Sequence, residues 1–227
     1  MMERIVLDGA GMSRSDVQTA TLWCALACIL LGVVGGCSNA PPAIRPPDID
    51  ADQIATDAFS QYDRDSDGLI AGEELRAAPA LKFSRDRIDQ NGDKKISPEE
   101  LRQLVQTQWI DMESGLIRIR CNVTMNGRPL DGATVTLEPE QFMGGAISHA
   151  AGVTRGGMAR LDVSDEDRPD PNAHGVQHGM YLVRISLKKG DEELIPAKYN
   201  TETTLGCEVA KRAAYMPGPV RFDLRSQ

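Results

Sequence analysis

The chain has 227 residues, a formal net charge of −8 and a sequence pI near 5.0. This acidity argues against nucleic acid as a partner. Aromatic residues make up only 4% of the chain, which favours small β-rich or paired-helix cores over one large core.

The first predicted element is an export signal. An apolar run from Thr21 to Val34 is too short to span a membrane, which takes about 20 residues, and suits the centre of a signal peptide. Val34-Gly35-Gly36-Cys37 resembles a bacterial lipobox. The resemblance implies a signal peptide over residues 1–36, with Met12 as an alternative start, and a lipid on Cys37. An uncleaved membrane anchor and ordinary secretion stay open as alternatives.

Residues 37–50 contain four prolines, at positions 41, 42, 46 and 47, and predict an extended tether. The expected product is therefore a lipid-anchored membrane protein of the cell envelope, facing the periplasm or the outside. Of the five cysteines, Cys24 and Cys28 would leave with the signal peptide.

Residues 63–74 have the spacing of a calcium-binding loop. Ca²⁺ takes six to eight hard oxygen ligands, which a short loop presents at alternate positions. Gly68 allows the sharp turn, and a water would serve beside Ala71, which has no ligand atom. The pattern is that of an EF-hand loop, and its alternative is an acidic solvated turn before a helix. The expected ligands are Asp63, Asp65, Asp67, the Leu69 backbone carbonyl and Glu74.

Residues 89–100 repeat the pattern with one departure, because Lys94 stands where glycine is expected. A lysine at positive φ costs on the order of 1 kcal/mol, so we expect weaker calcium binding here. Ser97 could ligate directly or through water. The alternative is an unoccupied loop that braces the first. The expected ligands are Asp89, Asn91, Asp93, the Lys95 backbone carbonyl and Glu100.

The flanks of both loops predict helices, so residues 51–112 are expected to form an EF-hand pair. Apolar residues recur at helical spacing before the first loop, and a short exit helix ends at Pro79. Ser97 to Glu100 reads as a capping box with proline at the first helical position. Ile70 and Ile96 fall at position 8 of their loops and are expected to form a short antiparallel contact.

From Leu116 the apolar pattern changes to period two, and residues 115–227 predict an antiparallel β-sandwich. Cys121 and Cys207 both take inward positions on predicted strands. The pair could form a disulfide or remain two separate buried thiols, because pairing cannot be deduced from sequence. The expected strands cover residues 116–125, 133–138, 181–187, 203–210 and 220–224. The fold class is therefore α+β, with a helical EF-hand pair before a β-sandwich.

Three stretches of this second part resemble transthyretin-like domains of the carboxypeptidase-regulatory type. They are Gly127–Val135, which reads G-x-P-L-x-G-A-x-V, the pair Gly152–Thr154 and Gly157–Leu161, and Gly179–Ile185. The resemblance implies a prealbumin-like fold that is mostly accessory or adhesive. One enzymatic branch, the hydroxyisourate hydrolases, ends in Tyr-Arg-Gly-Ser, and that signature is missing here.

The sequence does not predict an enzyme. His149, His174 and His178 have no nucleophile beside them and no zinc-ligand spacing. The predicted function is a structural or interaction role for a Ca²⁺-binding envelope protein, with an unidentified envelope protein or glycan as partner. The alternatives are an accessory or adhesion module and an enzyme with its site in the loops of residues 142–178, which are long for a sandwich.

Overall fold

The computed structural model describes residues 47–110, 115–168, 172–210 and 219–226. The segment 1–36, Cys37 and most of the predicted tether therefore lie outside the described residues. Residues 43–227 form one compact unit. Among the described residues, no helix is long and apolar enough to cross a membrane.

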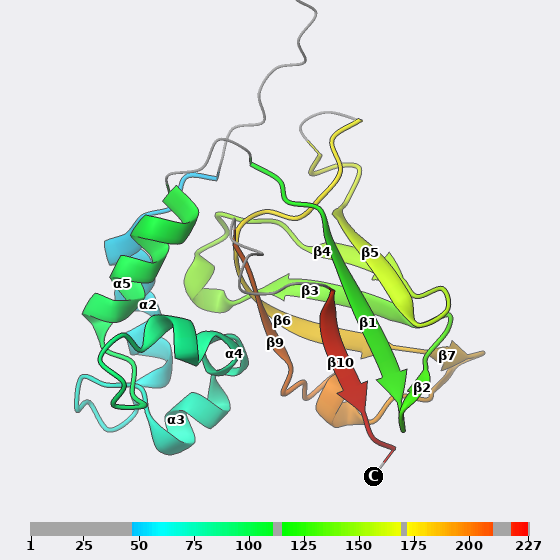
Figure 1. The fold of residues 1–227 in the computed structure, drawn as a ribbon, viewed down its shortest axis with the longest axis horizontal. Helices are drawn as coiled ribbons and strands as arrows, with labels where there is room; N and C mark the ends of the chain where they lie inside the picture. Colours follow the sequence, from blue (N-terminus) through cyan, green and yellow to red (C-terminus); the bar gives the residue numbers. More distant parts are fainter. Residues whose placement is uncertain (1–46, 111–114, 169–171, 211–218, 227) are drawn as a thin grey trace, which may run out of the picture. The chain divides into compact units, whose positions relative to one another are not determined.

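Four helices build the first part, as the loop flanks predict (Figure 1). Asp50 caps the first helix, because its side chain accepts hydrogen bonds from the backbone N–H groups of Asp52 and Gln53. Pro79 ends one helix and begins the next, and Pro98 follows the Ser97 cap. The helices are α2 (Ala51–Tyr62), α3 (Gly72–Ala77), α4 (Pro79–Ile88) and α5 (Pro98–Val105), which continues as the π-helical turn η1 (Gln106–Ile110).

The second part is a large, mainly antiparallel sheet, so the α+β layout is confirmed. Its order is β10-β1-β5-β4-β3-β6-β9, with β2 beside β1 and a separate β7–β8 hairpin. The strands are β1 (Ile119–Met125), β2 (Arg128–Pro129), β3 (Thr134–Pro139), β4 (Ala150–Val153), β5 (Met158–Val163), β6 (Gly179–Ser186), β7 (Lys188–Lys189), β8 (Glu192–Glu193), β9 (Gly206–Val209) and β10 (Val220–Leu224). Two short 3-10 turns, η2 (Gln141–Met143) and η3 (Ala197–Tyr199), lie between strands.

One strand pair departs from the antiparallel expectation. The last strand, β10, runs parallel to β1, with Cys121 opposite Val220 and Met125 opposite Leu224. The alternation of apolar and polar residues predicts each strand, but it carries no information about the direction of its neighbour.

The hydrophobic core is continuous from the helices to the sheet, which corrects the expectation of separate small cores. One cluster of buried residues includes Leu81 and Trp109 of the helical part together with Leu137 and Val183 of the sheet. Helix α4 packs against β9 and β6, so it covers one edge of the sheet (Figure 1). Most of the buried residues in this cluster are aliphatic.

Gly206 of β9 shows how closely the two parts approach. A Cβ atom at this position would overlap the backbone of Pro79 and Ala80 at the start of α4. Only glycine lets the strand lie directly against the helix terminus.

Candidate metal centre

The first loop gathers three carboxylates at one point. Oxygen atoms of Asp63, Asp65 and Asp67 lie within 4.8 Å of one another. Asp63 Oδ1 is buried and has no hydrogen-bond partner in the described structure. Carboxylates held this close repel one another, and an unpaired buried oxygen is costly, so the residues present fit a hard cation such as Ca²⁺.

Backbone N–H groups hold the carboxylates of this loop in place. Asp63 Oδ2 accepts from Gly68 N at 3.1 Å, and Asp67 Oδ1 accepts from Leu69 N at 2.8 Å. Glu74, the predicted closing ligand, accepts from Arg64 N at 2.8 Å through Oε1 and from Ala71 N at 3.3 Å through Oε2. The loop is thus ordered by the side chains that would also bind the ion.

These bonds keep Glu74 ready to bind. The hydrogen bond from the Arg64 backbone lowers the pKa of the Glu74 carboxyl below its ordinary value, and the bonds from Ala71 and Asp65 act in the same direction. The ionised form that a calcium ligand needs is therefore favoured.

The second loop has the same frame but fewer free oxygens. Both oxygens of Asp89 accept backbone bonds, from Gly92 N at 2.7 Å and from Lys94 N at 2.8 Å. The Asn91 side-chain amide donates to Asp93 Oδ2 at 3.2 Å. This arrangement holds less uncompensated negative charge than loop one, which agrees in direction with the predicted weaker binding.

Glu100 has two roles in the second loop. It accepts from Gln90 N at 3.1 Å across the loop, and it accepts from Ser97 N at 3.0 Å as the reciprocal half of the capping box. The predicted box is complete, since Ser97 Oγ accepts from Glu100 N at 3.3 Å.

Each loop has left-handed residues at its fourth and sixth positions, and each supplies glycine at only one of these two. Lys94 has φ of 66°, as its place in the loop predicts, beside Gly92 at 79°. In loop one the order is reversed, with Ser66 at 61° and Gly68 at 81°. The strain at Ser66 was missed by the sequence reasoning, although the Gly92 of the second loop, two places before Lys94, marks the equivalent position.

The two loops are joined back to back. Ile70 N donates to Ile96 O at 2.9 Å, and Ile96 N donates to Ile70 O at 3.0 Å. Both side chains are fully buried. The predicted antiparallel contact at position 8 is therefore confirmed, and it links the geometry of one loop to that of the other.

A buried carboxylate of the sheet holds the entering helix of loop one. Tyr62, the residue before the first ligand Asp63, donates its hydroxyl to Glu140 Oε2 at 2.9 Å. Glu140 Oε1 accepts from Ala80 N at 3.4 Å, so the same side chain reaches the start of α4. Burial raises the pKa of Glu140, and the hydrogen bond from Tyr62 opposes that shift.

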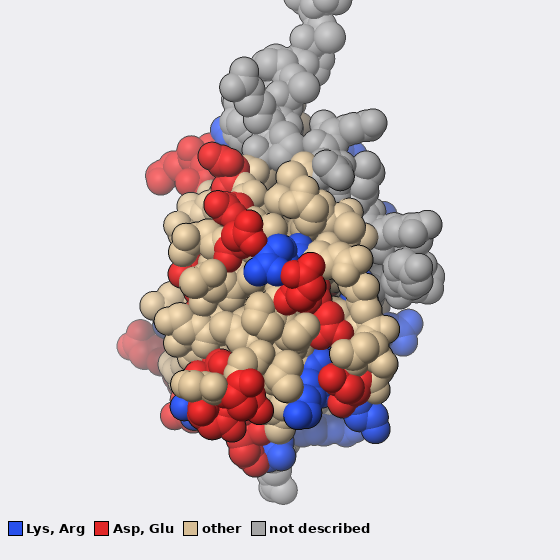
Figure 2. Space-filling model, turned by 90° about the vertical axis from the view of Figure 1, so that its left-hand side faces the viewer, with Lys and Arg blue, Asp and Glu red and all other residues tan. Residues whose placement is uncertain are grey.

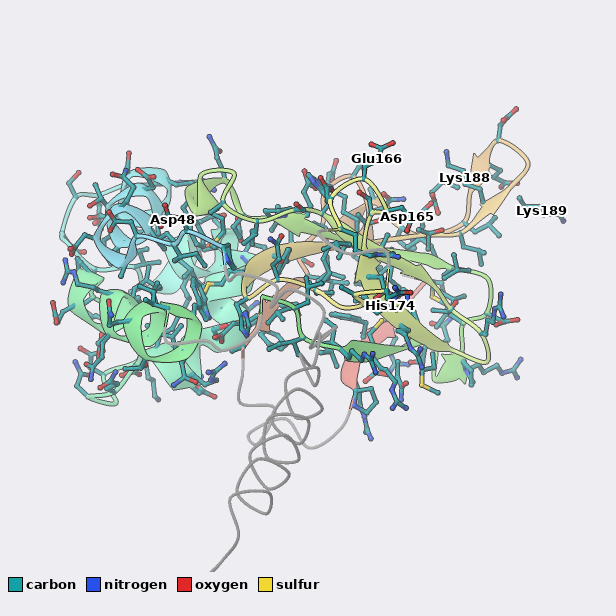
Figure 3. All side chains as sticks on the ribbon, turned by 90° about the horizontal axis from the view of Figure 1, so that it is seen from above. Asp48, Asp165, Glu166, His174, Lys188 and Lys189 are labelled. Carbon is teal, nitrogen blue, oxygen red and sulfur yellow. The ribbon has the colours of Figure 1, made fainter. Side chains whose placement is uncertain are left out.

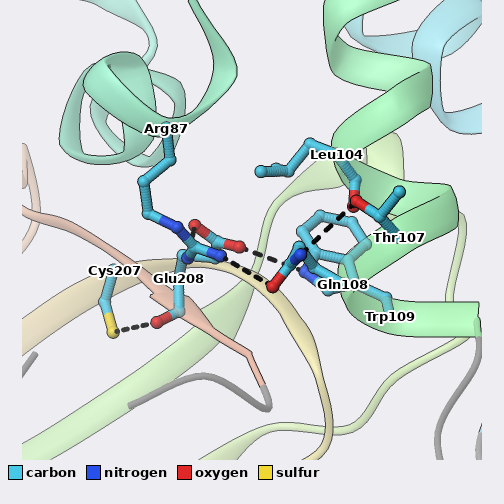
Figure 4. A network of polar contacts seen from close by, with 7 residues as sticks. All are labelled: Arg87, Leu104, Thr107, Gln108, Trp109, Cys207 and Glu208. Atoms are coloured by element: carbon cyan, nitrogen blue, oxygen red, sulfur yellow. Dashed lines mark hydrogen bonds and ion pairs between the residues drawn. The ribbon is translucent and has the colours of Figure 1, made fainter. Parts of the chain in front are cut away.

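A second buried carboxylate holds the entering helix of loop two (Figure 4). Arg87 Nη1 lies 2.5 Å from Glu208 Oε2, and Trp109 Nε1 donates to Glu208 Oε1 at 3.2 Å. Burial raises the pKa of Glu208, while the Arg87 guanidinium acts against it. Arg87 precedes the first ligand Asp89 by two residues, so each calcium loop begins next to a clamp from the sheet.

The remaining sequence candidates are scattered. Cys121 and Cys207 are both buried, as their strand positions predict, and both are free thiols in the structure. Burial raises the pKa of Cys121 to about 11. His174 Nδ1 lies 3.5 Å from Asp162 Oδ1, His178 is buried and His149 is exposed. No cluster of three metal-ligating residues in the described part includes a histidine.

The acidic character of the helical region is visible on its surface. Figure 2 faces this side of the molecule and shows Asp and Glu gathered in patches. A divalent cation would therefore meet a favourable field as well as a preformed loop.

Comparison with known proteins supports the same assignment. The EF-hand family model matches residues 54–78 and 86–105, which contain the whole of both loops and parts of their flanking helices. No curated protein and no solved structure matches the chain. The helical part is thus an EF-hand region, and calcium is its expected ligand.

Proposed function

We propose that this protein binds Ca²⁺ through both loops and uses the ion to fix the EF-hand region against the sheet. The observation that carries the proposal is the cluster of Asp63, Asp65 and Asp67 around the unpaired Asp63 oxygen. The role is structural rather than that of an opening sensor, because the Tyr62–Glu140 and Arg87–Glu208 contacts hold the entering helices to the sheet. No catalysis is part of this proposal.

Calorimetric calcium titration of residues 43–227 tests the proposal. We expect two saturable sites, the first lost in Glu74→Gln and the second in Glu100→Gln. The matched controls are Glu73→Gln and Glu99→Gln, because these neighbours point their carboxylates to Arg76 and Arg102 instead of a loop. Absence of binding up to millimolar calcium, or equal loss in the controls, would refute the assignment.

We further propose that Cys37 carries a lipid and anchors the protein in the cell envelope. The support is the lipobox-like sequence after an apolar run. Mass spectrometry of the full chain expressed in a bacterium should find acyl chains on Cys37, lost in Cys37→Ser and retained in Cys28→Ser. A product that keeps residues 1–36, or that is cleaved without acylation, would contradict the anchor.

For the sheet we propose a transthyretin-like accessory module with an interaction role. The support is the glycine-marked hairpin of β4 and β5, at the place where the motifs put it. Adhesion between copies is a second candidate, because calcium would order the acidic surface in Figure 2. Light scattering with and without calcium separates the two, since only adhesion predicts calcium-dependent oligomers.

A further inference from the structure

A row of arginines lies on the outer face of β10, β1 and β5. In the β1–β5 register Arg120 stands directly opposite Arg160, and in the β1–β10 register Arg221 stands beside Asn122. The neighbours of Arg160 and Arg221 along their strands are buried, and Arg120 lies between half-buried Ile119 and buried Cys121, so the three arginines share the exposed side of the sheet. Arg118 extends the row beyond the start of β1 and is also exposed. We call these four residues the arginine face.

The arginine face has no direct partners among the described residues. Within those ranges, none of its four side chains makes a hydrogen bond or an ion pair. Two acids lie on the same side of the sheet, Asp162 two residues after Arg160 and Asp223 two residues after Arg221, so four arginines against two acids leave a net charge of +2. Asp162 lies 3.5 Å from His174, and Asp223 accepts from the Thr124 hydroxyl at 2.7 Å. Like charges directly opposite each other across strands destabilise a sheet. The Arg120–Arg160 pair therefore lowers the stability of the isolated protein.

The arginine face is separate from the calcium loops. The helical region packs on β9 and β6, whereas the arginines lie on β10, β1 and β5 at the other end of the strand order. The acidic loops therefore do not cancel its charge, although the chain as a whole carries −8. A negatively charged partner would meet this face first.

We propose that the arginine face docks on the anionic phosphates of a lipid bilayer. The charges spread over three strands about 4.8 Å apart and along β1, so they form a two-dimensional array. A single extended acidic peptide follows one line and could pair with only part of it, whereas a bilayer presents phosphates in a plane. Guanidinium groups bind phosphate with two parallel hydrogen bonds.

This contact goes beyond calcium binding and does not depend on it. Where Cys37 carries a lipid, the anchor and the arginine face would meet the same surface, and the domain would lie with a fixed side toward it. Two weak membrane signals together give stable attachment where each alone gives reversible binding.

The test is co-sedimentation of residues 43–227 with vesicles of phosphatidylglycerol and phosphatidylcholine, and with phosphatidylcholine alone. This unit lacks the leader and Cys37, and its described core lies within it. Calcium is chelated throughout, so that the ion neither bridges acidic side chains to lipid nor links this result to the calcium proposal. We expect binding to the anionic vesicles only, weakened by salt.

The variant Arg120→Gln, Arg160→Gln, Arg221→Gln should bind the anionic vesicles roughly a hundredfold more weakly. Its matched control is Lys82→Gln, Lys188→Gln, Lys189→Gln, which removes the same charge from α4 and from the β7–β8 hairpin (Figure 3). Retained thermal unfolding and calcium titration show that both variants fold.

Three results would overturn the inference. In the first, the wild-type unit does not sediment with anionic vesicles. In the second, the arginine variant binds these vesicles no more weakly than the lysine control does. In the third, the wild-type unit binds immobilised polyglutamate but not vesicles. The last would assign the face to an acidic polypeptide instead.

Discussion

Lys94 places a Cβ atom in a backbone conformation that suits glycine, and it adds a positive charge to a loop that collects oxygens. Lys94→Gly should relieve the left-handed strain and raise the free energy of unfolding by roughly 0.5–1 kcal/mol, net of the entropy that glycine adds to the unfolded chain. It should also tighten calcium binding at the second loop several-fold. Urea unfolding without calcium and calorimetric titration measure the two effects.

Lys94→Gln separates the two causes, because it removes the charge and keeps the Cβ atom. It should share the gain in calcium affinity but not the gain in stability. If the glycine variant is no more stable than the glutamine variant, the left-handed φ of 66° carries no cost in this loop.

Glu140 makes stability depend on pH. Because burial raises the pKa of Glu140, the folded chain keeps a proton that the unfolded chain has already released. The free energy of unfolding should therefore fall as pH rises from the ordinary glutamate pKa through the higher folded value, and level off above it. Urea unfolding from about pH 4 to about pH 8 measures this slope.

Glu140→Gln should reduce that slope, with the remainder in the same direction coming from Glu208, whose pKa burial also raises, and it should be at least as stable as wild type at neutral pH. A glutamine can still accept from Ala80 N and donate to the Tyr62 hydroxyl. Glu140→Ala leaves both groups unpaired and should cost about 1–3 kcal/mol. Equal slopes in the wild type and the glutamine variant would show that another group titrates.

At the scale of elements, β9 shows where sequence reasoning succeeds and where it fails. Period-two alternation identifies the strand and correctly turns Cys207 and Val209 inward. The same alternation places Gly206 and Glu208 on the solvent side, yet all four residues are buried. Helix α4 and Trp109 cover that second face, and no local pattern records a contact made so far along the chain.

The calcium loops were predictable for the opposite reason. Their ligands lie within twelve consecutive residues, so the spacing itself encodes the geometry that the ion demands. The contacts Tyr62–Glu140 and Arg87–Glu208 join residues that are far apart in sequence, and an isolated glutamate directly after β3 or within β9 carries no signal of its partner. The fold class was thus readable, whereas the joint between its two parts was not.

Gly206→Ala tests that joint. Its Cβ atom would overlap the backbone of Pro79 and Ala80, which cannot move aside as a flexible side chain would. We expect a loss of about 2–3 kcal/mol in unfolding free energy, at the upper end of the roughly 1–3 kcal/mol that overpacking typically costs. The control is Gly190→Ala in the β7–β8 turn, where the added atom meets nothing within 4 Å but the residue has φ of 64°.

The control therefore reports the cost of left-handed strain alone, on the order of 1 kcal/mol. If Gly206→Ala costs no more than the control, the close approach of β9 to α4 does not hold in solution. Far-UV circular dichroism with urea gives both values.

For the whole molecule, the continuous core predicts that calcium stabilises the sheet as well as the loops. Ligand binding to the folded state alone adds about 2.7 kcal/mol per site at a hundred times its Kd. In a unit of this size, that raises Tm by roughly 5–10 °C. Calorimetry with calcium and with a chelator should show one unfolding transition that moves as a whole.

Independent halves would behave differently, with a calcium-sensitive transition for the helices and an insensitive one for the sheet. Near-UV signals separate the two cases, because Trp109 reports the joint through Glu208 while Tyr181 lies buried in β6 of the sheet. Coupling is supported if both signals melt together and if the rise in Tm with calcium is smaller for both in Glu74→Gln, which keeps only the second site. A Tyr181 transition unmoved by calcium would confine the effect of the ion to the helices, since the Tyr62–Glu140 and Arg87–Glu208 contacts would then transmit nothing.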